Sequence, residues 1–191
     1  IYSLTHNLGM SNSVRGNTKG KYPTVAFVSV GSCNDIEDDN NMAYLVLREV
    51  LPGTHIIRVI DRDDKSDQEV NECRTRGVRV LGRRTIESYL LDDEILSKLC
   101  DALGASAKRD EVIGAKRTCI QQSIGRGNPS DDIKSAAGPI SVELKRILEL
   151  KQCGNSLDAF FRDTLVPLIT EDTKVYREIE GTFFQDDSEV G

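Results

Sequence analysis

Two aspartates that directly follow a largely apolar run are the residues of this chain best suited to chemistry. The run covers residues 55–60, and Asp61, Arg62 and Asp63 come next. Such a run is typical of a strand buried in a parallel sheet, and sites in open α/β sheets lie at the carboxyl ends of the strands. Mg²⁺ is commonly bound by one or two carboxylates, several waters and a substrate phosphate. The motif therefore predicts a site for Mg²⁺ or Mn²⁺ and indicates phosphate chemistry.

The elements around this motif are expected to form an α/β fold. Residues 24–30 and 78–81 are short runs rich in β-branched residues, which indicates two further strands. Helical patterns over residues 39–51 and 66–76 connect the three strands. This order requires parallel strands and right-handed crossovers. We therefore expect a mainly parallel, Rossmann-like sheet flanked by helices.

The second half of the chain is expected to be helical. Asp92 is a suitable N-cap for a helix whose apolar stripe ends before Gly104. A stretch over 125–139 is rich in Gly, Pro, Ser and Asp, which favours a long exposed loop. Three more helices are expected near residues 140–152, 156–168 and 173–184.

These patterns predict three parts of the chain. A polar lead-in covers residues 1–22, and an α/β domain covers residues 23–104. A helical C-terminal extension over residues 105–191 is expected to pack on that domain. The length allows one good-sized core with such an appendage.

Composition places the chain among soluble globular proteins. Of its 191 residues, 38% are hydrophobic and 29% are charged. No apolar stretch approaches the roughly 20 residues that cross a bilayer, so no membrane partner is expected. The five cysteines lie far apart without a CxxC pair, which fits packing thiols in a reducing compartment and hence a cytoplasmic location.

The charge distribution bears on nucleic-acid binding. A net charge of −6 speaks against a generic nucleic-acid coat protein, because unspecific phosphate binding depends on accumulated Lys and Arg. It does not exclude a nuclease, because one local stripe of arginines could hold a phosphate backbone. The candidate stripe consists of Arg74, Arg76, Arg79, Arg83 and Arg84. The alternative is that these arginines form a solvated face.

Three stretches together resemble one known domain. The first expected strand ends at Gly31 with an acidic loop behind it, the second ends in Asp61-x-Asp63, and the third leads to the segment 83–90, Arg-Arg-Thr-Ile-Glu-Ser-Tyr-Leu. They resemble a TOPRIM domain, most closely that of bacterial ATPases related to the overcoming-lysogenization-defect (OLD) nucleases. The segment 159–176 is similar to the carboxyl ends of such proteins. The resemblance covers residues 24 to 184.

The resemblance implies a function and a set of site residues. Asp61 and Asp63 would bind Mg²⁺ or Mn²⁺, Glu87 would add or orient a ligand, and Arg83 or Arg84 would neutralise charge on the phosphate. In a two-metal arrangement, one ion activates water and the other stabilises the leaving oxygen. The implied activity is phosphodiester hydrolysis of DNA. It would serve a larger ATPase, in the same longer chain or as a partner, in a role such as phage defence.

One departure from the family's pattern bears on activity. The first strand of the family normally ends in Glu before Gly, whereas Val30 precedes Gly31 here. Three explanations remain open: Asp35 or Glu37 replaces the missing acid, the metal site is degenerate, or the register differs. Asp35 resembles the second acid of the first motif.

These considerations leave two main functions. The first is a metal-dependent nuclease domain, and the second is a degenerate TOPRIM-like module that binds or regulates without turnover. An aspartyl-phosphate phosphatase is disfavoured, because its aspartates should follow the first strand. ATP hydrolysis by this chain alone is not expected, because it has no Gly-rich Lys-Ser/Thr loop. The sequence leaves open whether the chain forms a homo-oligomer.

Overall fold

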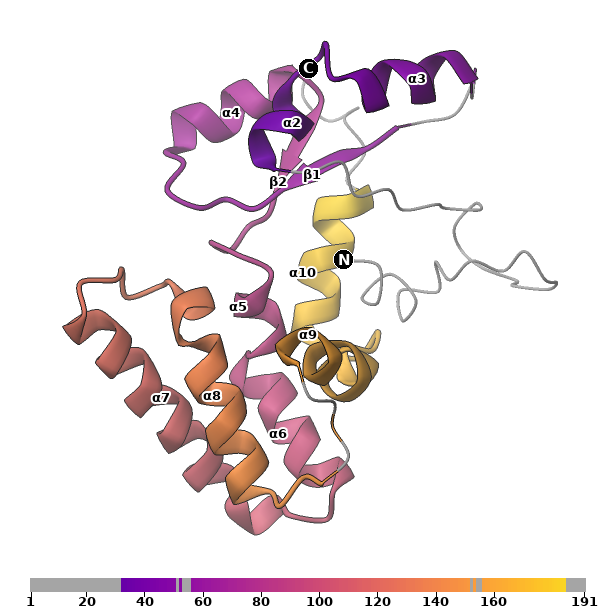
Figure 1. The fold of residues 1–191 in the computed structure, drawn as a ribbon. Helices are drawn as coiled ribbons and strands as arrows, with labels where there is room; N and C mark the ends of the chain where they lie inside the picture. Colours follow the sequence, from indigo (N-terminus) through magenta and orange to yellow (C-terminus); the bar gives the residue numbers. More distant parts are fainter. Residues whose placement is uncertain (1–31, 51, 53–55, 152, 154–155, 185–191) are drawn as a thin grey trace, which may run out of the picture. The chain divides into compact units, whose positions relative to one another are not determined.

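The structure is a computed structural model that describes residues 32–50, 52, 56–151, 153 and 156–184 (Figure 1). The contacts divide the chain into two compact units. We call the part that contains residues 85–177 the helical unit, and the part that contains the described residues up to Arg84 and from Glu178 onward the sheet unit. The expected lead-in over 1–22, the expected first strand over 24–30 and Val30 lie outside the described residues.

The sheet unit contains a small parallel sheet of two strands. β1 (Arg58–Ile60) pairs with β2 (Val78–Val80), and Ile60 lies opposite Val80 in the register. The sequence prediction of parallel strands at these two places is confirmed, although each strand is shorter than its apolar run. Among the described residues the protein is mostly helical with this one sheet, which is compatible with the α/β class. The Rossmann-like TOPRIM arrangement stays a prediction.

The crossover between the strands is the helix α4 (Asp67–Thr75). Ser66 caps it in a reciprocal capping box, because its hydroxyl accepts from Glu69 N while the Glu69 carboxylate accepts from Ser66 N over 2.8 Å. Gly77 follows the helix with φ of +70°, a conformation that glycine adopts without strain. The predicted helix over 66–76 is therefore confirmed.

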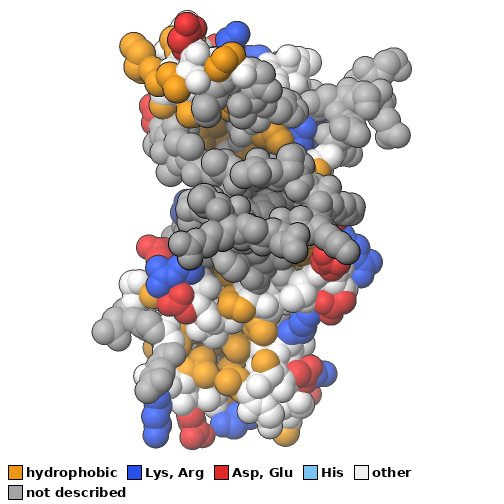
Figure 2. All heavy atoms as spheres, turned by 90° about the vertical axis from the view of Figure 1, so that its right-hand side faces the viewer, with side chains coloured by type: hydrophobic (Ala, Val, Ile, Leu, Met, Phe, Trp, Pro, Cys, Tyr) orange, Lys and Arg blue, Asp and Glu red, His pale blue; other side chains and the backbone are white. Residues whose placement is uncertain are grey.

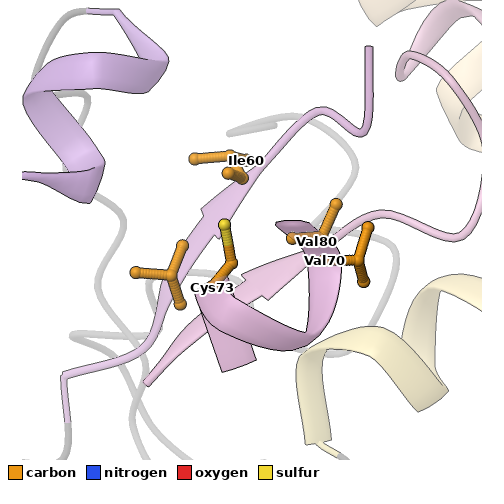
Figure 3. Close-up of a cluster of buried hydrophobic side chains, with 5 residues drawn as sticks. Ile60, Val70, Cys73 and Val80 are labelled. Carbon is orange, nitrogen blue, oxygen red and sulfur yellow. The ribbon is translucent and has the colours of Figure 1, made fainter. Parts of the chain in front are cut away.

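The core of the sheet unit lies between α4 and the strands (Figure 3). It consists of the buried side chains Ile60, Val70, Cys73, Val78 and Val80. Val78 and Val80, which are alternate residues of β2, both belong to it, as the two-residue period of a strand requires. Cys33 and Ile36 of the helix α2 (Cys33–Glu37) pack against this cluster.

The segment before β1 contains two helices where one was expected. α2 falls where an acidic loop was predicted, and α3 (Met42–Val50) begins three residues later than predicted. Ser32 caps α2, and the side chain of Asn41 accepts from Ala43 N over 2.9 Å at the start of α3. These caps favour two short helices because Ser and Asn satisfy the free N–H groups of a first turn.

A buried arginine joins the elements of this segment. Arg58 on β1 is only 8% exposed, and it pairs with Asp39 at 2.6 Å. Its guanidinium also donates to the carbonyl oxygens of Ile36 and Arg76, and it lies 4.6 Å from the ring centroid of Tyr44 on α3. One cation thereby connects α2, α3 and the end of α4 to the sheet.

The helical unit is an assembly of short and medium helices. Its elements are α5 (Glu87–Leu90), α6 (Asp93–Ala102), the 3-10 turn η2 (Ser106–Lys108), α7 (Arg109–Gly125), α8 (Ile133–Ile147), α9 (Leu157–Phe160), the π-helical turn η3 (Phe161–Leu165), the 3-10 turn η4 (Val166–Leu168) and the first turn of α10 (Lys174–Phe184). Asp92 caps α6 as predicted, and Gly104 has φ of +65° just after it. α7 packs along α8 (Figure 1).

The predicted loop over 125–139 is wrong, because only residues 126–132 connect α7 to α8. Pro139 lies inside α8, where proline normally costs about 3 kcal/mol. The buried side chains of Ala136, Ile140 and Leu144 outweigh this cost, since they form one fully buried face of the helix. Tertiary burial thus overrides the local composition.

Two carboxylates in the helical unit hold the start of α10. Glu94 on α6 accepts from Lys174 N over 3.0 Å and from Val175 N over 3.2 Å. Asp172 pairs with Lys98 at 3.0 Å and accepts a bond from the Thr170 hydroxyl. The Thr170 hydroxyl and then Lys98 lower the pKa of Asp172 to about 2.

Candidate functional site

The two aspartates of the motif lie just past the carboxyl end of β1. Asp61 is half-buried and Asp63 is exposed. The backbone N–H of Asp63 donates to the carbonyl oxygen of Arg84 over 2.9 Å, and Leu81 N donates to Ile60 O over 3.0 Å. The loop after β1 therefore runs beside the loop after β2, at the edge of the sheet where the sequence predicted a site.

Asp63 has an unusual backbone conformation. Its φ is +47°, in the left-handed region that is uncommon for residues other than glycine. Aspartate tolerates this region better than most residues do. Asp63 lies in a turn that is closed by a bond from Lys65 N to Arg62 O over 3.0 Å. The chain thus turns sharply at Asp63.

The start of α2 approaches this turn through Cys33. Its Sγ lies 3.9 Å from Oδ2 of Asp63. Burial and then the negative charges of Asp63 and Asp61 raise the pKa of the Cys33 thiol, against the lowering effects of Lys65 and of a backbone bond at Asp61. The same two carboxylates that disfavour a thiolate at this point would favour a cation.

Asp35 is engaged within its own helix. Its Oδ2 accepts from the backbone N–H and from the hydroxyl of Ser32, each over 2.7 Å. These bonds lower the pKa of Asp35, and they complete the capping box of α2. The structure therefore shows this carboxylate as a cap.

Glu37 is held by two cations. It pairs with Lys65 and with Arg76, each at 3.0 Å, and its side chain is 19% exposed. Burial alone would raise the pKa of Glu37, but the hydrogen bonds and charges of these two partners outweigh it and lower the pKa. Glu37 thereby connects α2 to the loop after β1 and to the end of α4.

Glu87 is the first residue of α5 and belongs to the helical unit. Its Oε2 is buried, as is Oγ1 of Thr85, and neither has a hydrogen-bond partner within the described part of the chain. Buried polar atoms are nearly always bonded, so each of these two atoms calls for a partner that the described residues do not supply. A carboxylate oxygen of this kind is suited to a cation or a water.

Four of the five arginines in the candidate stripe contact protein acceptors. Arg76 pairs with Glu37, Arg83 pairs with Glu178 at 2.8 Å, Arg84 pairs with Asp64, and Arg79 donates to the carbonyl oxygens of Phe183 and Thr182. Arg74 lies exposed in the last turn of α4.

On the helical unit, in the lower part of Figure 2, acidic and basic side chains are interspersed on the face shown.

The sequence interpretation missed the partners of these acids. The spacing Ser32-x-x-Asp35 resembles the capping box of Ser66-x-x-Glu69, and it would have identified Asp35 as a cap. Cys33 carries no sequence signal, because its closeness to Asp63 depends on how α2 packs against β1. The pairing of Glu37 with Lys65 likewise joins residues far apart in the sequence.

The two aspartates of the motif fit a simple kind of metal site. Two carboxylates on one loop are sufficient for a hydrated Mg²⁺ or Mn²⁺ that also binds a phosphate. Within the ranges that the structure describes, no three His, Cys, Asp or Glu side chains form a group of metal ligands. A single, largely hydrated ion therefore fits these two carboxylates.

Comparisons with known protein families, with curated proteins and with solved structures found no match for this chain. Among the described helices, none combines the length and the apolar character that a membrane span requires.

Proposed function

We propose that this chain is a divalent-metal-dependent nuclease domain that hydrolyses phosphodiester bonds of DNA. One observation carries the proposal: Asp61 and Asp63 lie at the carboxyl end of β1, beside the loop after β2 and within reach of α2. In this proposal the sheet unit is a TOPRIM-like fold. The proposed cofactor is Mg²⁺ or Mn²⁺.

Each proposed role follows from the position of a side chain. Asp61 and Asp63 would hold the ion, which supplies Lewis-acid activation of a water or of a phosphate oxygen. The raised pKa of Cys33 keeps its thiol neutral, so it adds no charge to the site. Glu87, which the resemblance implies as an additional ligand or orienting residue, belongs to the helical unit, and its role at the ion stays a prediction.

A second candidate is a module that binds metal or DNA without turnover. The observation that favours it is the engagement of Asp35 by Ser32 and of Glu37 by Lys65 and Arg76. Neither acid replaces the glutamate expected at Val30 unless it gives up these partners. Such a module would serve as a regulatory part of the same assembly.

The wider setting is part of the proposal. An ATPase partner, in the same longer chain or as another subunit, would provide the nucleotide-dependent step that the residues of this chain do not provide. A bacterial, cytoplasmic role in phage defence follows from the resemblance to OLD-related proteins. The proposed reducing compartment rests on the wide spacing of the five cysteines, which include no CxxC pair.

A nicking assay on supercoiled plasmid tests the proposal. Wild-type protein should convert supercoiled plasmid to open circles in Mn²⁺ or Mg²⁺, and the double variant Asp61→Ala/Asp63→Ala should not. A matched control removes two exposed acids from the first turn of α7, Asp110→Ala/Glu111→Ala, and should nick like wild type. Activity that survives in the first double variant or in EDTA would refute the nuclease. Inactive wild type that binds Mn²⁺ would favour the binding module.

A further inference from the structure

The loop that carries the two aspartates is joined to the segment after β2 at successive points. Leu81 N bonds to Ile60 O over 3.0 Å, and Asp63 N bonds to Arg84 O over 2.9 Å. The guanidinium of Arg84 then pairs with the carboxylate of Asp64. Arg84 makes the last two of these contacts, so it binds the turn through both its backbone and its side chain.

The two partners of that ion pair differ in exposure. The side chain of Arg84 is 13% exposed, whereas that of Asp64 is 83% exposed. The side chain of Arg84 is therefore held by its surroundings, and it restrains the exposed side chain of Asp64. Because Asp64 follows Asp63 directly, this pair also limits the backbone freedom of Asp63.

Asp63 needs such a restraint. A left-handed residue with a side chain costs roughly 1–2 kcal/mol, so it persists only where its surroundings hold it. With φ of +47° at Asp63, loss of either contact to Arg84 allows the turn to relax toward commoner conformations. The carboxylate of Asp63 would then leave its place near the Cys33 thiol.

We propose that Arg84 is a positioning residue for the metal site, an inference that rests on the proposed function. Its carbonyl oxygen and guanidinium hold Asp63 and Asp64 in the turn that follows Asp61, and this turn sets the position of the proposed ligand Asp63. This role differs from the one that the sequence resemblance implies, in which Arg84 binds the substrate phosphate. A guanidinium that already pairs with Asp64 is suited to organising the loop.

A double-mutant cycle with two readouts tests the inference. The variants are Arg84→Ala, Asp64→Ala and their combination, with Arg109→Ala as control because Arg109 pairs with Asp101 in the helical unit. The first readout is hydrogen exchange of the Asp63 amide without metal, and the second is the dissociation constant for Mn²⁺. Each single variant should speed exchange and weaken Mn²⁺ binding by about threefold, as expected for one ion pair of this exposure. The combination should add nothing further, and the control should match wild type.

The outcomes separate the inference from the proposed function. Asp63 exchange that stays at the wild-type rate in both single variants overturns the inference. Arg84→Ala that reduces nicking but leaves Asp63 exchange and Mn²⁺ affinity unchanged places the guanidinium on the phosphate, which also overturns it while the nuclease stands. Wild type that binds no Mn²⁺ overturns the proposed function and the metal role of Arg84, and the exchange rates then still decide whether Arg84 holds the turn.

Discussion

The thiol of Cys33, at the start of α2, lies 3.9 Å from Oδ2 of Asp63 in the loop after β1. This relationship makes Cys33 a reporter of the charge at the candidate metal site. It is the one cysteine that is not buried, since Cys73, Cys100, Cys119 and Cys153 all are. Its reactivity can therefore be followed in the folded protein.

Alkylation of Cys33 should respond to metal. Burial and the charges of Asp63 and Asp61 raise the pKa of the thiol, so a cation bound by these carboxylates should lower that pKa and speed the reaction at least about twofold. The measurement is the rate of iodoacetamide labelling, followed by mass spectrometry, with and without Mg²⁺. In Asp61→Ala/Asp63→Ala the labelling should start faster and should not change with Mg²⁺. Identical rates in all four samples would contradict the charge relationship.

Arg58 should be important for the stability of the sheet unit. Arg58→Met leaves the carbonyl oxygens of Ile36 and Arg76 without their donor, so we expect a loss of about 1–3 kcal/mol in the free energy of unfolding. Arg48→Met is the matched control, because exposed Arg48 lies 5.6 Å from the centroid of the same Tyr44 ring. Urea denaturation measures both. Equal losses in the two variants would show that Arg58 has no special role.

Glu37 should prove structural and should not act as a metal ligand. Glu37→Gln weakens the pairs with Lys65 and Arg76, so the free energy of unfolding should fall by about 1 kcal/mol. The dissociation constant for Mn²⁺ should stay within about twofold of wild type, because the carboxylate already has two cationic partners. Calorimetric titration with Mn²⁺ measures it. A large loss of affinity without loss of stability would return Glu37 to the ligands that the sequence predicts.

Asp172 should make the thermal stability of the helical unit depend on pH. Its pKa in the folded protein is about 2, below the value of about 3.9 for a free aspartate. Its bonds to Thr170 and Lys98 therefore stabilise the fold fully above about pH 4, and this contribution is lost as the pH falls through about 2. The gap in melting temperature between wild type and Asp172→Asn should narrow over that range. A gap of constant size at every pH would rule out this linkage.

The sequence predicted local features well where one residue type has one dominant role. Asp92 caps α6 in the structure as the sequence predicts, because capping depends on neighbouring residues alone. Parallel pairing of β1 with β2 followed from the helix between them. Pro139 led to the wrong prediction of a loop, because the cost of a proline inside a helix is outweighed here by burial of one face of α8. That burial depends on tertiary packing and not on the local sequence.

The candidate site was predictable to a smaller extent. The position of Asp61 and Asp63 at a strand end follows from their place in the chain. The partners of Asp35 and Glu37 could not be predicted in this way. An acidic residue gives the same sequence pattern whether it binds a metal, caps a helix or pairs with a lysine such as Lys65. Nor does any local pattern reveal that Arg84 would bond Asp63 and Asp64, since that contact joins two loops.

The most direct test of the central claim is thermal unfolding against Mn²⁺ concentration. A ligand that binds only the folded state stabilises it by about 2.7 kcal/mol at a hundred times its dissociation constant. The melting temperature of wild type should therefore rise with Mn²⁺ and return to its starting value in EDTA, whereas that of Asp61→Ala/Asp63→Ala should stay constant. Equal rises in the two proteins, or no rise in wild type, would show that these aspartates do not form a metal site.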